Sequence, residues 1–255
     1  MSSLSTPVKV VGILTTVLLL IVVNPWFQIP EEQAQLADWI TYAFWISFIV
    51  LLVLLFMERD RPGGETMEVE GPAFTRFLFN NTKAGLFWLP IRLFLGFSWL
   101  DAGWHKFTDP AWIGAEAGTA LRGYWERAAA VPDEGRPAIT YEWYRNFIQL
   151  LLDNGAESWM TYVITFGEIA VGIGLIFGIL TGFAAFFGAL MNMSFLLAGS
   201  ASTNPVLFTL AVGLILAWKV AGYYGLDRYV LPMLGTPWRS PVAARPASVT
   251  GVSSS

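Results

Sequence analysis

Two ionisable residues stand inside long apolar segments of this sequence, where charge is costly. Arg92 lies in the apolar stretch 85–103 and Glu168 in the stretch 159–180. A charged side chain at the centre of a bilayer costs about 2.5–3.5 kcal/mol on insertion scales, so each residue needs a partner or a purpose. If the stretches are antiparallel helices, the two residues differ in depth by about 6 Å. We therefore expect them to pair, either as an ion pair that only fixes helix register or as a site that also binds a ligand or relays protons.

A stripe of residues on one helix face accompanies the arginine. Its members, spaced four, three, four and three residues apart, are Arg92, Gly96, Trp99, Gly103 and Lys106. This spacing is that of neighbours along one side of an α-helix. Glycines there allow a second helix to approach closely, and the indole N–H of Trp99 needs an acceptor. The stripe indicates either a packing seam or one wall of a polar site.

Three further positions are candidates for chemistry or for polar contacts. Asn192 lies near the middle of the apolar stretch 182–199, where it could hydrogen bond to Glu168. His105 is the only histidine and follows Asp101 by four residues, so the carboxylate could orient and charge it. We consider for His105 a proton-handling or quinone-headgroup role, a satisfied interfacial histidine, or axial ligation of a haem or chlorophyll. Asp227 and Arg228 are expected to form a surface ion pair.

The composition excludes several kinds of site. The chain has no cysteine and one histidine, so we predict no metal site, no disulfide and no covalent or bis-histidine haem. Any redox chemistry would need a borrowed cofactor or a partner. The net charge is −4 and there is no basic run, which argues against nucleic acid as a partner.

Six apolar segments must position these residues. The chain has 255 residues, of which 55% are hydrophobic and 13% charged, and its apolar blocks have the length that a helix needs to cross about 30 Å of hydrocarbon. We predict an all-α, polytopic, helical membrane protein surrounded by membrane lipid. Its spans are Val10 to Phe27, Asp38 to Met57, Gly85 to Gly103, Trp159 to Leu180, Gly182 to Gly199, and Pro205 to Tyr223.

The distribution of charge and composition predicts topology and domains. With the N-terminus inside, nine Lys and Arg residues lie on the cytoplasmic side and five lie in one outer loop, which favours N-in and C-in. We predict an N-terminal transmembrane hairpin, a cytoplasmic linker, a four-helix membrane core and a disordered tail, at residues 1–58, 59–84, 85–238 and 239–255.

The outer loop 104–158 is rich in aromatic residues, and we expect it to be ordered. Within it, Trp143, Phe147, Leu150 and Leu151 recur at helical spacing and are followed by Asn154-Gly155. This pattern predicts an interfacial helix lying over the outer mouth of the bundle.

Four motifs resemble the DoxX/DoxD family of four-helix membrane proteins, over about residues 85–238. They are Ala102 to Trp112 (AGWHKFTDPAW), which follows Arg92 and Gly96, Gly167 to Gly178 (GEIAVGIGLIFG), Met191 to Pro205 (MNMSFLLAGSASTNP), and Ala221 to Pro232 (AGYYGLDRYVLP). More narrowly, the sequence is similar to the DoxD-type subunit of thiosulfate:quinone oxidoreductase. The first hairpin is an addition to this pattern.

The resemblance implies a multi-pass subunit of a quinone-linked oxidoreductase in a bacterial or archaeal inner (cytoplasmic) membrane, with quinone and a partner protein subunit. Glu168, Arg92 and His105 are the candidate catalytic residues, with Glu168 as proton carrier. Trp99, Lys106, Asn192 and Asp101 are the candidate cofactor contacts. One alternative is a non-catalytic accessory or anchoring subunit of a larger respiratory or photosynthetic complex, and a second is a small-molecule or proton pathway.

Overall fold

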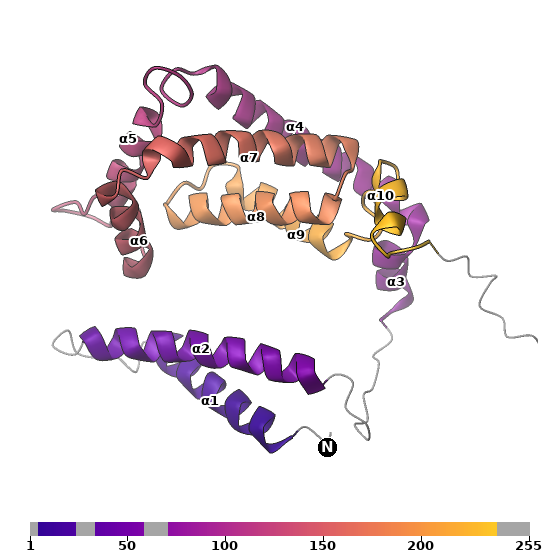
Figure 1. Ribbon diagram of the computed structural model, residues 1–255, viewed down its shortest axis with the longest axis horizontal. Helices are drawn as coiled ribbons and strands as arrows, with labels where there is room; N and C mark the ends of the chain where they lie inside the picture. The colour runs from indigo at the N-terminus through magenta and orange to yellow at the C-terminus, as the bar shows by residue number, and fades with distance from the viewer. Residues whose placement is uncertain (1–4, 24–33, 59–70, 239–255) are drawn as a thin grey trace, which may run out of the picture. The chain divides into compact units, whose positions relative to one another are not determined.

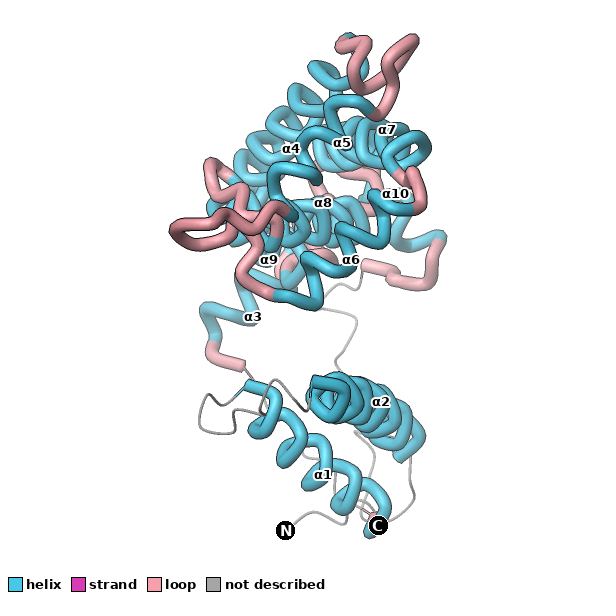
Figure 2. The backbone as a smooth tube through the Cα atoms, turned by 90° about the vertical axis from the view of Figure 1, so that its left-hand side faces the viewer, coloured by secondary structure: helices cyan, strands magenta, loops and turns pink. Residues whose placement is uncertain are grey.

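The computed structural model describes residues 5–23, 34–58 and 71–238, and within these ranges it contains helices and no strand (Figure 2). The chain divides into two compact units, Met1–Glu70 and Gly71–Ser255. The tail predicted at 239–255, and residues 59–70 of the predicted linker, lie outside the described residues.

The first unit is a pair of apolar helices. Helix α1 (Thr6–Val23) packs against α2 (Ala34–Glu58). Most of their large apolar side chains are exposed, including Ile13 and Trp39. Hydrocarbon is the environment that suits such a surface.

The second unit is built on four helices that close into a bundle. They are α4 (Gly85–Thr108), α7 (Glu157–Phe177), α8 (Thr181–Leu197) and α9 (Asn204–Leu216). Contacts join α4 to α7, α7 to α8, α8 to α9 and α9 back to α4 (Figure 1). These helices lie where the third to sixth apolar segments were predicted. In the described residues, 35–55 and 157–177 are the two stretches long and apolar enough to cross a membrane, and the full count of six spans remains a prediction.

Glycines bring α4 and α7 into backbone contact. A Cβ atom at Gly103 would lie 2.9 Å from the backbone nitrogen of Ile169, and one at Gly172 would lie 2.6 Å from that of Leu100. Because neither backbone can move aside cheaply, these positions require glycine. They also fix the antiparallel register, in which Gly103 lies beside Glu168 and Gly96 beside Ile176.

The loop between α4 and α7 is ordered and contains α5 (Thr119–Ala129) and α6 (Glu142–Asp153). Helix α6 confirms the helix predicted from the apolar spacing, and it ends at Asn154, before Gly155 with φ +61°. It buries Tyr144, Ile148 and Leu152. The side chains used for the prediction, Trp143, Phe147 and Leu150, are on the exposed face.

The opposite end of the bundle carries α3 (Ala73–Asn80), the 3-10 turn η2 (Thr82–Ala84) and α10 (Asp227–Met233). The indole N–H of Trp88 donates to the carbonyl of Leu78 at 2.8 Å. Leu78 and Phe79 pack on the core of the bundle. This part of the predicted linker therefore belongs to the second unit.

Candidate functional site

The buried carboxylate of the bundle is paired with a lysine. Lys106 Nζ donates to both carboxylate oxygens of Glu168, at 3.0 and 2.7 Å. The side chain of Glu168 is 1% exposed and that of Lys106 is 19% exposed. Lys106 Nζ also lies 5.0 Å from the ring centroid of Trp112, within the range of a cation–π contact. The charge of the buried Glu168 carboxylate is thus balanced by Lys106, whose side chain is partly exposed.

The predicted pair of Arg92 and Glu168 is wrong, because the helix register separates the two. Glu168 lies beside Gly103. Arg92 is eleven residues earlier in α4, about 16 Å farther along the helix. The start of α4 extends about three turns past the end of α7, so a depth counted from the first apolar residue placed Arg92 too far inside.

Arg92 instead lies at the α3/α10 end of the bundle. Its Nη2 donates to the carbonyl of Tyr224 at 3.1 Å, while its buried Nε and Nη1 have no hydrogen-bond partner. The guanidinium lies against Gly178 and Gly225, where no Cβ could be accommodated. Arg92 therefore holds the α7–α8 turn against the segment after α9.

Asp227 has a structural role in the same region, and the expected surface pair with Arg228 is wrong. Its side chain is fully buried. Its carboxylate accepts hydrogen bonds from the backbone N–H of Leu180 at 2.6 Å and of Thr181 at 2.9 Å. A carboxylate satisfies the free N–H groups at a helix start and suits the positive end of the helix dipole. Asp227 thus caps α8.

A cleft of about 770 Å³ opens beside the Lys106–Glu168 pair. Of the predicted site residues, it brings together Trp99, Asp101, Lys106 and Glu168. Among its apolar lining residues are Phe94, Phe195 and Leu207, and among the polar side chains that the sequence did not predict are Trp112, Tyr124, Arg127, Ser200 and Asn204.

Several polar atoms buried in the bundle lack partners. Trp99 Nε1 is buried without a hydrogen bond, in the space that Gly188 leaves on α8. The Asn192 amide is buried with neither its oxygen nor its nitrogen bonded, so the expected bond to Glu168 is not formed. A buried polar group without a partner costs about 1–3 kcal/mol. Such groups mark places that water or a polar ligand would complete.

Tyr124, which lines the cleft, contributes a third unpartnered donor. Burial raises the pKa of its hydroxyl, and an interaction with Ser200 offsets part of that effect. Ser200 lies close to the Tyr124 hydroxyl, but the geometry between them does not make a hydrogen bond, so this buried hydroxyl has no partner. Tyr124 therefore stays protonated at neutral pH and can donate into the cleft.

His105 and Asp101 are both exposed, each with a side chain 75% accessible. His105 Nδ1 lies 2.8 Å from the backbone oxygen of Asp101 and 3.5 Å from its Oδ1. Asp101 lines the cleft and His105 does not. Of the three candidate catalytic residues, the structure brings only Glu168 to the cleft.

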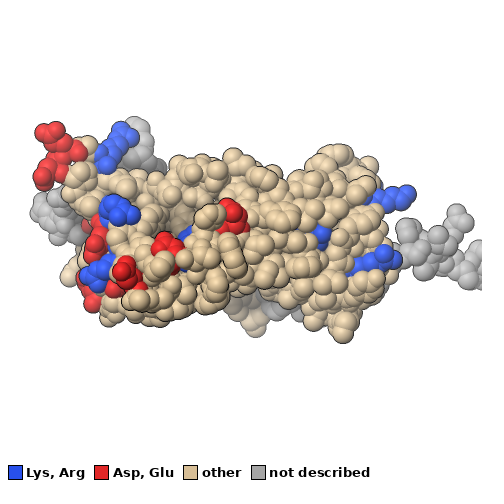
Figure 3. Space-filling view, turned by 90° about the horizontal axis from the view of Figure 1, so that it is seen from above, with Lys and Arg blue, Asp and Glu red and all other residues tan. Residues whose placement is uncertain are grey.

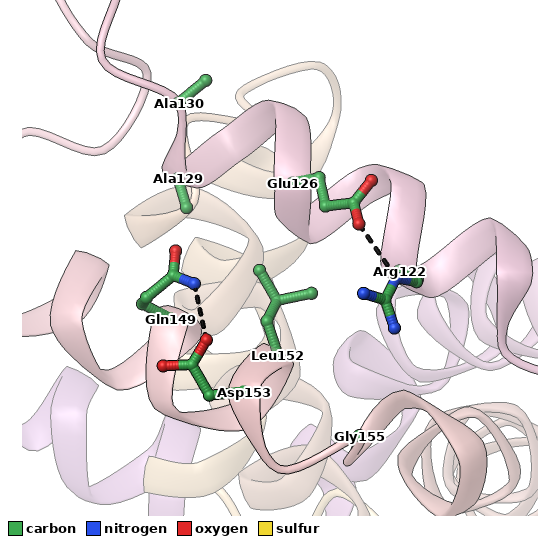
Figure 4. A pocket seen from close by; sticks show the side chains of 8 residues that line it. All are labelled: Arg122, Glu126, Ala129, Ala130, Gln149, Leu152, Asp153 and Gly155. Atoms are coloured by element: carbon green, nitrogen blue, oxygen red, sulfur yellow. Dashed lines mark hydrogen bonds and ion pairs between the residues drawn. The ribbon is translucent and has the colours of Figure 1, made fainter.

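A separate polar hollow of about 530 Å³ lies between α5 and α6 (Figure 4). Arg122 donates to Glu126 at 2.9 Å and to Glu157 at 2.8 Å, and these hydrogen bonds, that of Glu126 first, raise the pKa of its guanidinium. Gln149 donates to Asp153 at 2.9 Å. The polar side chains of the hollow are thus already engaged in hydrogen bonds. No group of three His, Asp or Glu residues in the described part of the chain is arranged to hold a metal ion.

Comparison with known proteins finds one family. Residues 87–200, which run from α4 to α8, match the family model described as DoxX. No curated protein and no solved structure matches the chain.

Proposed function

Because residues 87–200 form a domain of the DoxX family, whose members are membrane proteins, we propose that this protein is the membrane subunit of a quinone-linked oxidoreductase. The activity is like that of the DoxD-type subunit of thiosulfate:quinone oxidoreductase. The proposed location is the inner membrane of a bacterium or archaeon, with the chain crossing it several times.

The observation that carries the proposal is the buried Lys106–Glu168 pair at the wall of a large cleft that also holds unpartnered donors. A quinone ring is flat, with a carbonyl acceptor at each end. Lys106 and Tyr124 contribute a donor each among the residues that line this cleft, and Phe94, Phe195 and Leu207 offer apolar walls. Sites for such ligands combine apolar walls with a few placed polar groups. The residues present therefore fit a quinone headgroup.

The roles of the residues follow from their contacts. A quinone, when bound, accepts electrons and protons. Glu168 is positioned to hold and deliver a proton at the cleft, and Lys106 stabilises its ionised form through two hydrogen bonds. Headgroup binding is assigned to Lys106 and not to Arg92, which lies at the other end of the bundle. With no cysteine in the chain, a partner subunit supplies the electrons.

The test is Glu168→Gln, compared with Glu126→Gln on the exposed side of α5. Glutamine keeps an acceptor for Lys106 but cannot carry the proton. Quinone-dependent electron transfer by the purified protein with its partner should fall by about 10²-fold or more in Glu168→Gln, while the variant stays folded, as shown by a single cooperative thermal unfolding transition. Glu126→Gln should behave as the wild type. A normal rate in Glu168→Gln would remove this residue from the mechanism, and a wild type that retains no quinone would contradict the proposal.

A further inference from the structure

A second cavity adjoins the cleft and has a different character. Its volume is about 300 Å³, and Tyr124 and Phe195 line both spaces. No charged side chain lines it. The hydroxyl of Tyr144, one of its polar groups, is already donated to the carbonyl of Ser194 at 2.9 Å. The polar cleft and the apolar cavity are thus neighbours that share Tyr124 and Phe195 as lining residues.

The apolar cavity reaches the outside of the bundle between three helices. Phe147 of α6, Val163 of α7 and Leu190 of α8 line it and are 45%, 55% and 51% exposed. Such apolar side chains at the surface of a membrane protein face hydrocarbon. Its mouth therefore opens toward the bilayer and not toward water.

We propose that this cavity holds the hydrocarbon tail of the ligand whose ring occupies the cleft. The ligand class is then a long-chain, lipid-soluble quinone that enters from the bilayer between α6, α7 and α8 and passes Tyr124 and Phe195. This inference rests on the proposed function. A ligand with a polar ring and an apolar tail would place the ring in the charged cleft and the tail in the uncharged cavity. It is the two spaces side by side, and neither one alone, that point to such an amphipathic ligand.

The experiment compares two ligands on two variants. The ligands are a benzoquinone with a decyl chain and the same ring with a methyl group in its place. Val163 is exposed on α7 and lines the cavity, so Val163→Trp should fill the mouth of the cavity. Ile173 is also exposed on α7 but does not line the cavity, so Ile173→Trp is the control that introduces the same side chain elsewhere on the helix. Affinities are measured by titration of the purified full-length protein in one detergent.

Val163→Trp should weaken binding of the decyl ligand by about tenfold, the effect of displacing roughly two buried methylenes, and leave the methyl ligand unchanged. Ile173→Trp should change neither affinity. Equal weakening of both ligands, or none, would overturn the tail site while leaving the quinone function standing. A wild type that binds neither ligand would overturn the quinone function and the tail site with it. Loss of a copurified phospholipid from Val163→Trp, with decyl binding intact, would show that the cavity holds lipid and overturn the tail site.

Discussion

Lys106 and Glu168 form an ion pair whose members differ in their access to solvent. Glu168 is almost fully buried, whereas Lys106 is partly exposed and also contacts the Trp112 ring. Burying a carboxylate carries a desolvation penalty that only a well-placed cation offsets. The stability of this region therefore depends on the pair being complete more than on either residue alone.

Removing one partner should destabilise the protein, and removing both should restore much of the loss. Lys106→Met leaves the carboxylate uncompensated and should lower the free energy of unfolding by about 3 kcal/mol. The double variant Lys106→Met with Glu168→Met should recover most of that, as measured by denaturant titration in micelles. The exposed residue Glu126, changed to Met, should leave stability close to that of the wild type. Strictly additive losses from the two single changes would argue against a direct pair.

At the scale of the helices, glycine positions decide which residues meet. The contact of α4 with α7 depends on Gly96, Gly103 and Gly172, where an added Cβ would strike backbone atoms of the opposite helix. The same contact sets the register that brings Lys106 to Glu168. A change in this seam should therefore affect the site as well as stability.

Gly172→Ala tests the seam against Gly167→Ala on the same helix. A Cβ at Gly172 would lie 2.6 Å from the backbone nitrogen of Leu100, whereas one at Gly167 has the Met191 sulfur at 3.7 Å as its nearest neighbour. Gly172→Ala should cost about 1–3 kcal/mol of unfolding free energy, because the helices must separate. Gly167→Ala should be neutral or slightly stabilising, since alanine favours the helix. Equal thermal unfolding midpoints for the two variants would rule out close helix approach at Gly172.

The sequence predicts where most helices of this fold lie, but it does not predict which side chains meet between them. Apolar runs located six helices, although the last of them, α9, ends at Leu216 and not at Tyr223 as predicted. The spacing of Trp143, Phe147 and Leu150 located α6. Helix α5 was not predicted, although the residues that it buries, Leu121, Trp125 and Ala128, recur at helical spacing in the sequence. The partners of Arg92 and Asp227 could not be read from spacing, since they depend on helix register and on the chain reversal after α9. The cleft residues from 112–127 and 195–207 meet only through tertiary packing.

At the scale of the second unit, charge is distributed unevenly along the bundle. On the face shown in Figure 3, the end that carries α5 and α6 shows both acidic and basic side chains, and the end that carries α3 and α10 shows only basic ones. Exposed Lys83 and Lys219 belong to the latter end. Cytoplasmic loops of membrane proteins carry an excess of Lys and Arg, and in the predicted topology nine such residues lie on the cytoplasmic side against five in the outer loop. The cleft beside Lys106 would then open toward the outer side.

This topology can be tested directly because the chain has no cysteine, so that one introduced thiol reports on one position. Glu134 lies exposed between α5 and α6, and Lys83 lies exposed just before α4. In intact cells, a membrane-impermeant maleimide should label Glu134→Cys at once and label Lys83→Cys only after the membrane is opened. Both variants should label equally in detergent, which controls for intrinsic reactivity. The reverse pattern in intact cells would place the cleft on the cytoplasmic side and contradict the orientation that the basic residues predict.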